Sequence, residues 1–202
     1  EGHKTGFYSD QRENRALLSQ LAQGRDILNC FSYTGGFGVW AMANGAKTVV
    51  NADVSASAIE ISKKNFELNG LDLSRVGHLQ EDVFVCLRKF RDSGKSFDMI
   101  ILDPPKFVES KVQLERGARG YKDINLLAFK LLRPGGVLMT FSCSGLITPE
   151  LFQKIVSDAA LDAGREVHIL KRLFQASDHT VSLNFPEGLY LKGLLCKSVS
   201  LK

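Results

Sequence analysis

The chain has few of the residues that build metal sites and disulfide frameworks. Its four cysteines are widely scattered, no C-x-x-C pair occurs, and no histidine joins a cysteine at metal-ligand spacing. This usage indicates neither a zinc site nor a disulfide scaffold and favours reduced thiols. The sequence also lacks an apolar run of membrane-spanning length, a signal-peptide core, internal repeats and low-complexity tracts. We therefore expect a cytoplasmic protein without a metal or a membrane contact.

The composition is typical of one globular domain. With 202 residues, of which 44% are hydrophobic and 24% charged, the chain can bury a core of ordinary size. Its net charge of +4 permits an anionic partner without requiring one, so the location of the charge is more informative than its sum.

Short apolar runs alternate along the chain with segments of helical pattern. Strands are expected at 27–31, 48–52, 76–80, 97–102 and 137–141, and helices at 11–22, 37–44, 58–68, 83–91, 123–132 and 149–163. Asp10 can cap the first helix, and Ser55 or Ser57 the third. Residues 166–200 are rich in strand pattern, with a turn at 186–188. This order predicts an α/β fold with a doubly wound, mostly parallel sheet and a C-terminal antiparallel hairpin.

The stretch from residue 26 to residue 53 has the pattern strand, glycine turn, helix, strand. The glycines of the turn at 32–36 let the backbone approach a ligand closely, and Asp53 can accept both ribose hydroxyls of a nucleoside cofactor. The spacing differs from G-x-G-x-x-G, which disfavours a nicotinamide enzyme. From this stretch alone, a glycine turn that serves only packing remains the alternative.

Polar or reactive residues follow each of the first five expected strands, and ligands of open α/β sheets bind at that edge. Asp82 can accept the adenine amino group while the Val83 N–H meets a ring nitrogen, although a plain helix cap is the simpler interpretation. Asp103 precedes two prolines, which fix an extended loop that can hold a flat base beside the carboxylate.

Cys143 is the candidate nucleophile because it lies between two serines at a strand end and is followed by Gly145. A thiolate there can attack a substrate if a neighbouring group lowers its pKa. The alternative is a small core residue, which is the role expected for Cys30, Cys86 and Cys196 in their apolar runs.

Residues 106–122 form a charged segment that is expected to be a loop. Basic side chains with interleaved aromatics suit an unstacked RNA strand, through phosphate contacts and base stacking, whereas charge alone is equally typical of a solvated loop. The candidate RNA-binding residues are Lys106, Phe107, Lys111, Arg116, Arg119, Tyr121 and Lys122.

Six motifs occur in one order along the chain. They are Lys4-Thr5-Gly6-Phe7-Tyr8 with Asp10-Gln11-Arg12, Asn29-Cys30-Phe31-Ser32-Tyr33-Thr34-Gly35-Gly36-Phe37, Asp103-Pro104-Pro105-Lys106-Phe107, Arg119-Gly120-Tyr121-Lys122-Asp123-Ile124-Asn125, Phe141-Ser142-Cys143-Ser144-Gly145 and Pro186-Glu187-Gly188-Leu189-Tyr190-Leu191-Lys192-Gly193. Together they resemble the catalytic domain of bacterial 23S ribosomal RNA cytosine-C5 methyltransferases over essentially the whole chain.

The resemblance implies a class I S-adenosylmethionine fold with seven strands, a ribosomal RNA substrate, Cys143 as nucleophile and Asp103 as the carboxylate that orients the base. It also implies an N-terminal RNA-binding domain of the PUA type, which this chain does not contain. The cofactor contacts expected are Tyr8, Gln11, Phe31, Ser32, Gly35, Gly36, Asp53, Val54, Asp82, Val83 and Asp103. No oligomeric state is predicted.

Two departures from related patterns matter. The family tends to read Asp-His-Pro where this chain has Asp178-His179-Thr180, and in the wider group a cysteine can follow the two prolines where this chain has Lys106. Cys143 is therefore the sole candidate nucleophile. Two alternatives stay open: an rRNA guanine methyltransferase on the same fold, which needs no cysteine, and a non-catalytic RNA-binding or assembly factor.

Overall fold

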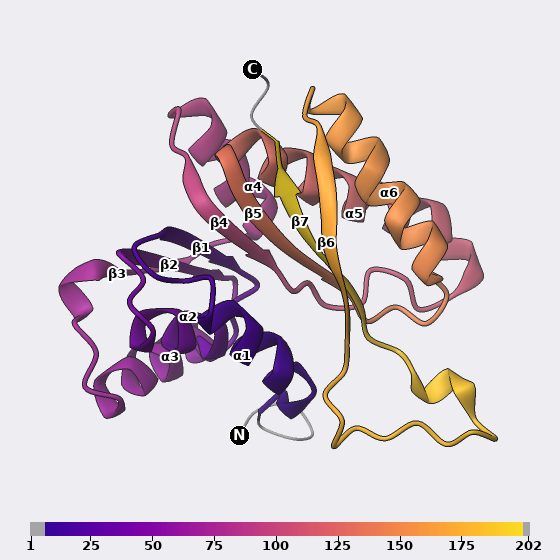
Figure 1. The fold of residues 1–202 in the computed structure, drawn as a ribbon, viewed down its shortest axis with the longest axis horizontal. Helices are drawn as coiled ribbons and strands as arrows, with labels where there is room; N and C mark the ends of the chain where they lie inside the picture. The colour runs from indigo at the N-terminus through magenta and orange to yellow at the C-terminus, as the bar shows by residue number, and fades with distance from the viewer. Residues whose placement is uncertain (1–6, 200–202) are drawn as a thin grey trace.

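The computed structural model describes residues 7–199, in which seven strands form one sheet with helices on both faces (Figure 1). The strands are β1 (Asp26–Cys30), β2 (Thr48–Asp53), β3 (Val76–Gln80), β4 (Phe97–Leu102), β5 (Leu132–Ser142), β6 (Val167–Phe174) and β7 (Lys192–Ser198). The helices are α1 (Arg12–Ser19), α2 (Gly36–Ala43), α3 (Ala56–Leu68), α4 (Val83–Asp92), α5 (Leu114–Leu131) and α6 (Pro149–Asp162). Four short 3-10 turns are η1 (Ser9–Gln11), η2 (Leu73–Arg75), η3 (Lys111–Gln113) and η4 (Pro186–Gly188).

The sheet has the order β3-β2-β1-β4-β5-β7-β6. Strands β1 to β5 are parallel, and β7 pairs antiparallel with both β5 and β6. The predicted seven-stranded, doubly wound sheet with a C-terminal antiparallel hairpin is therefore confirmed. No helix within residues 7–199 is both long and apolar enough to cross a membrane.

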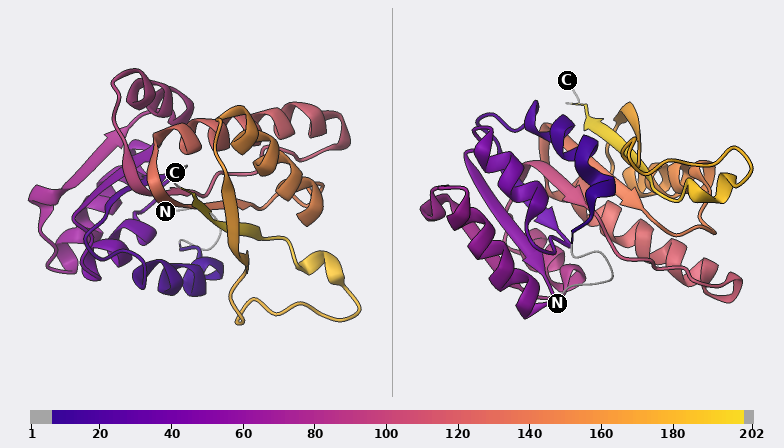
Figure 2. Two further views of the ribbon diagram at one scale, coloured as in Figure 1. Left: turned by 45° about the horizontal axis from the view of Figure 1, so that its top comes forward. Right: turned by 90° about the horizontal axis from the view of Figure 1, so that it is seen from below.

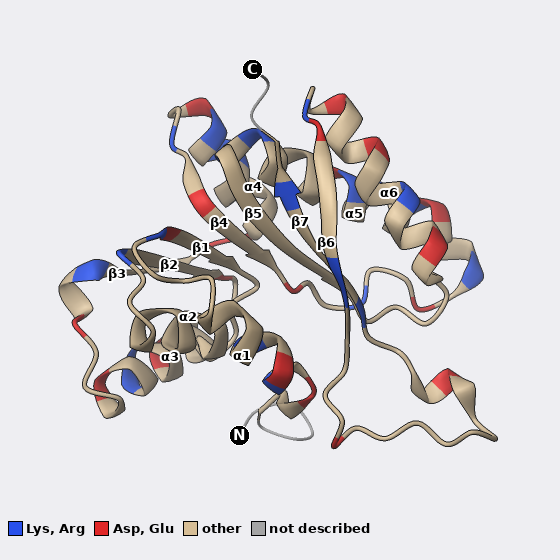
Figure 3. Ribbon diagram, in the orientation of Figure 1, with Lys and Arg blue, Asp and Glu red and all other residues tan. Residues whose placement is uncertain are grey.

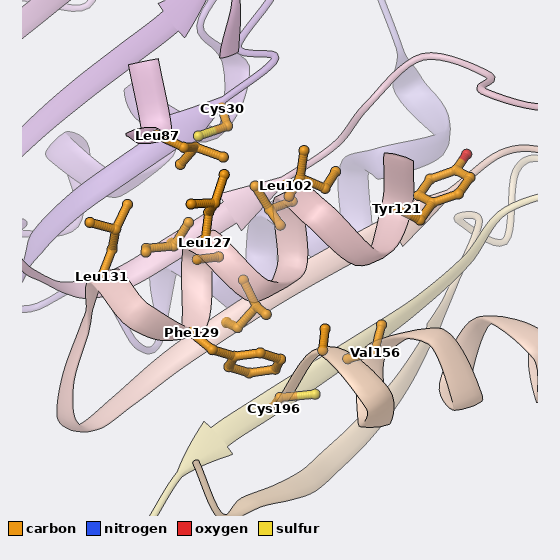
Figure 4. Close-up of a cluster of buried hydrophobic side chains, with 14 of the residues drawn as sticks. Cys30, Leu87, Leu102, Tyr121, Leu127, Phe129, Leu131, Val156 and Cys196 are labelled. Atoms are coloured by element: carbon orange, nitrogen blue, oxygen red, sulfur yellow. The ribbon is translucent and has the colours of Figure 1, made fainter. Parts of the chain in front are cut away.

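The core lies in two layers, one on each face of the sheet. Alternate residues of β1 point to opposite layers. Leu28 and Cys30 pack between the sheet and helices α4, α5 and α6, whereas Ile27 packs between the sheet and helices α1, α2 and α3. Figure 4 shows Cys30 and Leu87 in the first layer, with Tyr121 at its end. Cys86 and Cys196 are buried in that layer too, as predicted.

Two predicted details are wrong. Asp10 does not cap α1, because its carboxylate is buried and accepts a 2.6 Å hydrogen bond from the Tyr190 hydroxyl. Helix α5 begins at Leu114 rather than at residue 123, so most of the predicted charged loop is helical. Two caps are confirmed, because Ser55 accepts from the Ala58 N–H at the start of α3 and Asp82 accepts from the Val85 N–H at the start of α4.

A long connection, residues 175–191, joins β6 to β7 and extends away from the sheet (Figures 1 and 2). Gln175 closes its base: its amide nitrogen donates to the carbonyls of His179 and Gly188, and its amide oxygen accepts from the Tyr190 N–H. The expected turn at 186–188 is one 3-10 turn within this connection. The N-terminal segment 1–6, including the first part of the Lys4 motif, lies outside the described residues.

Candidate active site

The centre of the sheet is a switch point, because the chain leaves β1 toward β2 on one side and leaves β4 toward β5 on the other. Ligands of such sheets bind outside the carboxyl ends of the strands at this point. A pocket lies there, between residues 7–15 and the turns that follow β1 and β4. Its lining residues are Phe7, Tyr8, Gln11, Arg15, Phe31, Ser32, Tyr33, Thr34, Gly36, Phe37 and Asp103.

The turn after β1 has an unusual backbone. Phe31 and Tyr33 have positive φ angles of 56° and 47°, and Gly35 follows at 80°. Non-glycine residues rarely adopt this region, and strain of this kind clusters at functional sites. At Gly35 a side chain is also excluded, because a Cβ atom would lie 2.2 Å from the Ser62 hydroxyl oxygen. The turn is held from β2, where the Asp53 carboxylate accepts from the Tyr33 N–H at 2.8 Å.

The pocket residues fit a small polar cofactor. The Ser32 hydroxyl and the Arg15 Nε are buried without a hydrogen-bond partner, and both residues line the pocket. The backbone of Gly36 also lines it, where a Cβ atom would come into contact with Arg15 and Phe7 at 3.5 Å. A ligand with hydroxyl or carboxylate groups would satisfy the two unpaired atoms, since a buried polar group without a partner costs about 1–3 kcal/mol.

Sequence reasoning missed Arg15. Its guanidinium is 4% exposed, donates to the Tyr8 carbonyl at 2.9 Å and lies over the Phe7 ring at 4.5 Å. The available signal was its position four residues after Gln11, which places both side chains on one face where the chain becomes helical.

The remaining predicted cofactor residues lie farther along the same edge of the sheet and outside the lining of this pocket. The Asp53 carboxylate accepts from the N–H groups of Tyr33 and Ser55, and two of its roughly four lone-pair sites stay available. Val54 is 69% exposed beside it, Asp82 is exposed at the cap of α4, and Val83 is buried. Their contacts to adenosine stay predictions.

Asp103 is half-buried at the end of β4, and its Oδ1 accepts a 3.0 Å hydrogen bond from the Gln11 amide. Gln11 is oriented in turn by Asn14, whose amide donates to Gln11 Oε1 at 2.7 Å. Burial and the nearby Asp10 carboxylate raise the pKa of Asp103 to about 7, against the opposing effects of Gln11 and Arg15. A carboxyl group with this pKa can hold a proton near neutral pH and donate it.

Cys143 follows β5 and is half-buried, unlike the other three cysteines. Its thiol lies 3.9 Å from the Pro104 carbonyl, immediately after Asp103, so the two candidate groups belong to adjoining loops. Burial and the Asp103 carboxylate raise the pKa of the Cys143 thiol to about 11. Ser144 fixes the Cys143 loop, because its hydroxyl bonds the Tyr121 hydroxyl at 2.9 Å and accepts from the Val108 N–H at 3.2 Å.

The predicted RNA-binding set is divided by the structure. Tyr121 is fully buried and therefore cannot stack on an RNA base, so that prediction is wrong. Phe107 is half-buried against Tyr121, with ring centroids 4.7 Å apart. The two aromatic residues thus pack together, and Tyr121 supports the loop that contains Cys143 and Ser144.

The basic members of the set are at or near the surface, and acidic residues lie among them on α5 and α6 (Figure 3). Arg119 pairs with Glu115, and Lys122 pairs with Asp162 at 2.7 Å. Lys106, Lys111 and Arg116 are exposed. The RNA-binding role of all five basic residues stays a prediction.

Comparisons with known proteins show the family to which the chain belongs. The family model described as S-adenosylmethionine-dependent methyltransferase matches residues 1–189. Proteins named ribosomal RNA large subunit methyltransferase I are 61% identical in Tolumonas auensis and 59% identical in Aeromonas salmonicida, over 98% of this chain and 50% of each relative. The structure of SMU.776 complexed with SAH superposes with a TM-score of 0.87 at 27% identity, over 98% of this chain and 51% of that one.

The chain thus spans about half the length of the curated relatives it matches. The family match covers nearly all of it, from residue 1 to the residue after the 3-10 turn η4. The chain belongs to the S-adenosylmethionine-dependent methyltransferase family.

Proposed function

We propose that this chain methylates carbon 5 of a cytosine in large-subunit ribosomal RNA through a covalent adduct at Cys143. The observation that carries the proposal is the 3.9 Å contact between the Cys143 thiol and the Pro104 carbonyl. It places the half-buried Cys143 against the loop that follows Asp103, which lines the pocket. The names of the relatives support ribosomal RNA as the substrate.

S-Adenosylmethionine, when bound, supplies a methyl group on a positively charged sulfur. The residues suited to hold it are the turn at 31–36, Arg15 and Asp53. The turn and Arg15 present unpaired buried polar atoms and an open glycine backbone, and Asp53 has free carboxylate lone pairs. In this proposal Asp53 accepts the ribose hydroxyls.

Cytosine carbon 5 is a weak nucleophile, and Cys143 would activate it. An electron pair of the thiolate forms the S–C6 bond, and the C5=C6 π pair moves to form C4=C5. The C4=N3 π pair moves onto N3, which takes the proton of Asp103. Carbon 5 then has enamine character and accepts the methyl group, while the C4=N3 bond re-forms. Loss of the carbon-5 proton to a base restores C5=C6 as the thiolate leaves, and N3 returns its proton to Asp103.

Both faces of the pyrimidine are needed in this reaction, because sulfur adds to the ring while the methyl group arrives. The target cytosine must therefore be unpaired or flipped out of a helix. The exposed Lys106, next to the two prolines after Asp103, is suited to contact a flanking phosphate.

The test compares Cys143→Ala with a matched control, Cys86→Ala, which removes a buried thiol far from the chemistry. With labelled cofactor and large-subunit ribosomal RNA, Cys143→Ala is expected to lose methylation, and Cys86→Ala to retain it. RNA containing 5-fluorocytosine is expected to trap a covalent complex through Cys143 only, because fluorine cannot leave as a proton. Full methylation by Cys143→Ala together with no trapped complex would refute the adduct and favour a guanine methyltransferase.

A further inference from the structure

A buried lysine lies beside the Cys143 loop. Lys192 is the first residue of β7, is 6% exposed, and its ammonium donates to the Ser144 carbonyl at 2.8 Å. Its backbone pairs with Ser142 in the antiparallel ladder between β5 and β7. Lys192 is therefore tied to the residue before Cys143 through the backbone and to the residue after it through the side chain.

Lys192 has no carboxylate partner among residues 7–199, since none of their ion pairs includes it. Lysine is almost never fully buried without such a partner, because removing an ammonium from water is costly. One carbonyl hydrogen bond compensates this cost only in part. An anion close to the side chain would account for its position.

The Cys143 thiol is the ionisable group that meets this need. The charged groups that act on it are Asp103 and Lys106 from the loop after β4 and Lys192 from β7. Asp103 opposes ionisation of the thiol, and both lysines favour it. Lys106 is exposed, so solvent screens its charge, whereas Lys192 is enclosed and fixed by its hydrogen bond.

We propose that Lys192 is a positioning residue whose fixed ammonium charge stabilises the thiolate form of Cys143. When the thiol ionises, its proton leaves to water, the electron pair stays on sulfur, and the negative charge is offset by the Lys192 ammonium. Burial lowers the pKa of Lys192, and the charge of the Cys143 thiolate raises it again. The proposal rests on the proposed function only for its purpose, because the ionisation of Cys143 can be measured without RNA. It also gives a role to the motif Leu191-Lys192-Gly193, which the cofactor and base contacts leave unused.

The test measures the rate at which iodoacetamide modifies Cys143 at pH 8.5, followed by mass spectrometry of the peptide that contains it. The variants are Lys192→Met, which keeps the length of the side chain without its charge, Lys192→Arg, which keeps the charge, and Lys197→Met, a control at the exposed lysine of the same strand. A nearby opposite charge shifts a pKa by about one unit or more, and each unit changes the thiolate fraction about tenfold. We therefore expect Lys192→Met to react about tenfold more slowly and Lys197→Met to react as the wild type does.

Rescue by Lys192→Arg separates charge from packing, because a purely structural role would not be restored by a larger cation. Lys192→Met is expected to melt no lower than the wild type, since replacing an unpaired buried charge is often neutral or stabilising. An unchanged rate in Lys192→Met, or a slowed rate in Lys106→Met alone, would overturn the proposal. Methylation by Cys143→Ala would refute the adduct instead and leave the thiol measurements standing.

Discussion

The proposed reaction predicts how methylation depends on pH, through two groups on adjoining loops. In that proposal Asp103 must be protonated to donate to N3, and Cys143 must be ionised to attack carbon 6. Burial raises the pKa of Asp103 to about 7 and that of Cys143 to about 11. The productive form thus has a protonated Asp103, which is the stronger acid, and an ionised Cys143, which is the weaker one. This form is a small fraction of the enzyme at every pH.

The two titrations cancel over a wide range. Between pH 7 and pH 11 each unit of pH lowers the protonated fraction of Asp103 about tenfold and raises the thiolate fraction about tenfold, so kcat/KM is flat. Below pH 7 Asp103 stays protonated while the thiolate still declines, so kcat/KM falls about tenfold per unit. In Asp103→Asn the first titration is absent, and we expect kcat/KM to be much lower and to rise about a hundredfold from pH 7 to pH 9.

The assay is methyl incorporation from labelled cofactor into ribosomal RNA, under conditions where kcat/KM is measured from pH 6 to pH 9.5. Removing the Asp103 carboxylate also removes a charge that raises the pKa of Cys143, so the rise in the variant is expected to level off at a slightly lower pH. A variant with a flat profile parallel to that of the wild type would refute the assignment of the proton to Asp103.

Three further variants test the pocket and its support. Gly36→Ala adds a methyl group to the pocket lining, at ordinary contact distance from its protein neighbours, so little change in melting temperature is expected. Calorimetry should find that SAH binds at least about tenfold more weakly, and unchanged affinity would contradict the pocket assignment. Tyr121→Phe removes the hydroxyl bonded to Ser144 and should lower the free energy of unfolding in urea by about 1 kcal/mol and slow methylation; wild-type activity would show that the Cys143 loop needs no such support. Leu28→Ala in the fully buried core should cost about 2–5 kcal/mol in the same assay, and a loss under 1 kcal/mol would contradict the packing described for β1.

The sheet could be predicted from the sequence because its central strands are buried on both faces. Such strands are continuous apolar runs, and the run Phe97–Leu102 ends at Asp103 in the structure as it does in the pattern. The polar residue after each run then locates the ligand-binding edge. Because the carboxyl ends of parallel strands lie at one edge of the sheet, the sequence alone predicts that Asp103 and Cys143 are neighbours.

The helix around Tyr121 was not predicted, because the charged segment 106–122 was interpreted as a loop. In the structure Gly117 and Gly120 are helical and allow α5 to approach the chain at Phe107. A Cβ atom on Gly117 would lie 2.2 Å from a Val108 methyl carbon, and one on Gly120 would lie 3.3 Å from the Phe107 ring. These glycines therefore serve tertiary contact, which local propensity does not report.

The positive φ angles of Phe31 and Tyr33 and the burial of Lys192 were equally hidden. Aromatic residues have no preference for the left-handed region, so only the surrounding turn imposes it. Lys192 lies in a strand pattern where a charged residue normally faces solvent. Lys192 is buried because β6 and α6 pack against β7. These contacts join residues far apart in the sequence, so local sequence does not reveal them.

The candidate cofactor-binding residues and the candidate reacting residues come from different halves of the chain. The residues suited to grip the cofactor come almost entirely from the segment that ends with α4, whereas the reacting and supporting groups come from Asp103 onward. Substitutions in the second half should therefore yield variants that bind the methyl donor to saturation but do not transfer its methyl group. Such variants would be useful reagents for trapping the proposed complex of cofactor-loaded enzyme and RNA.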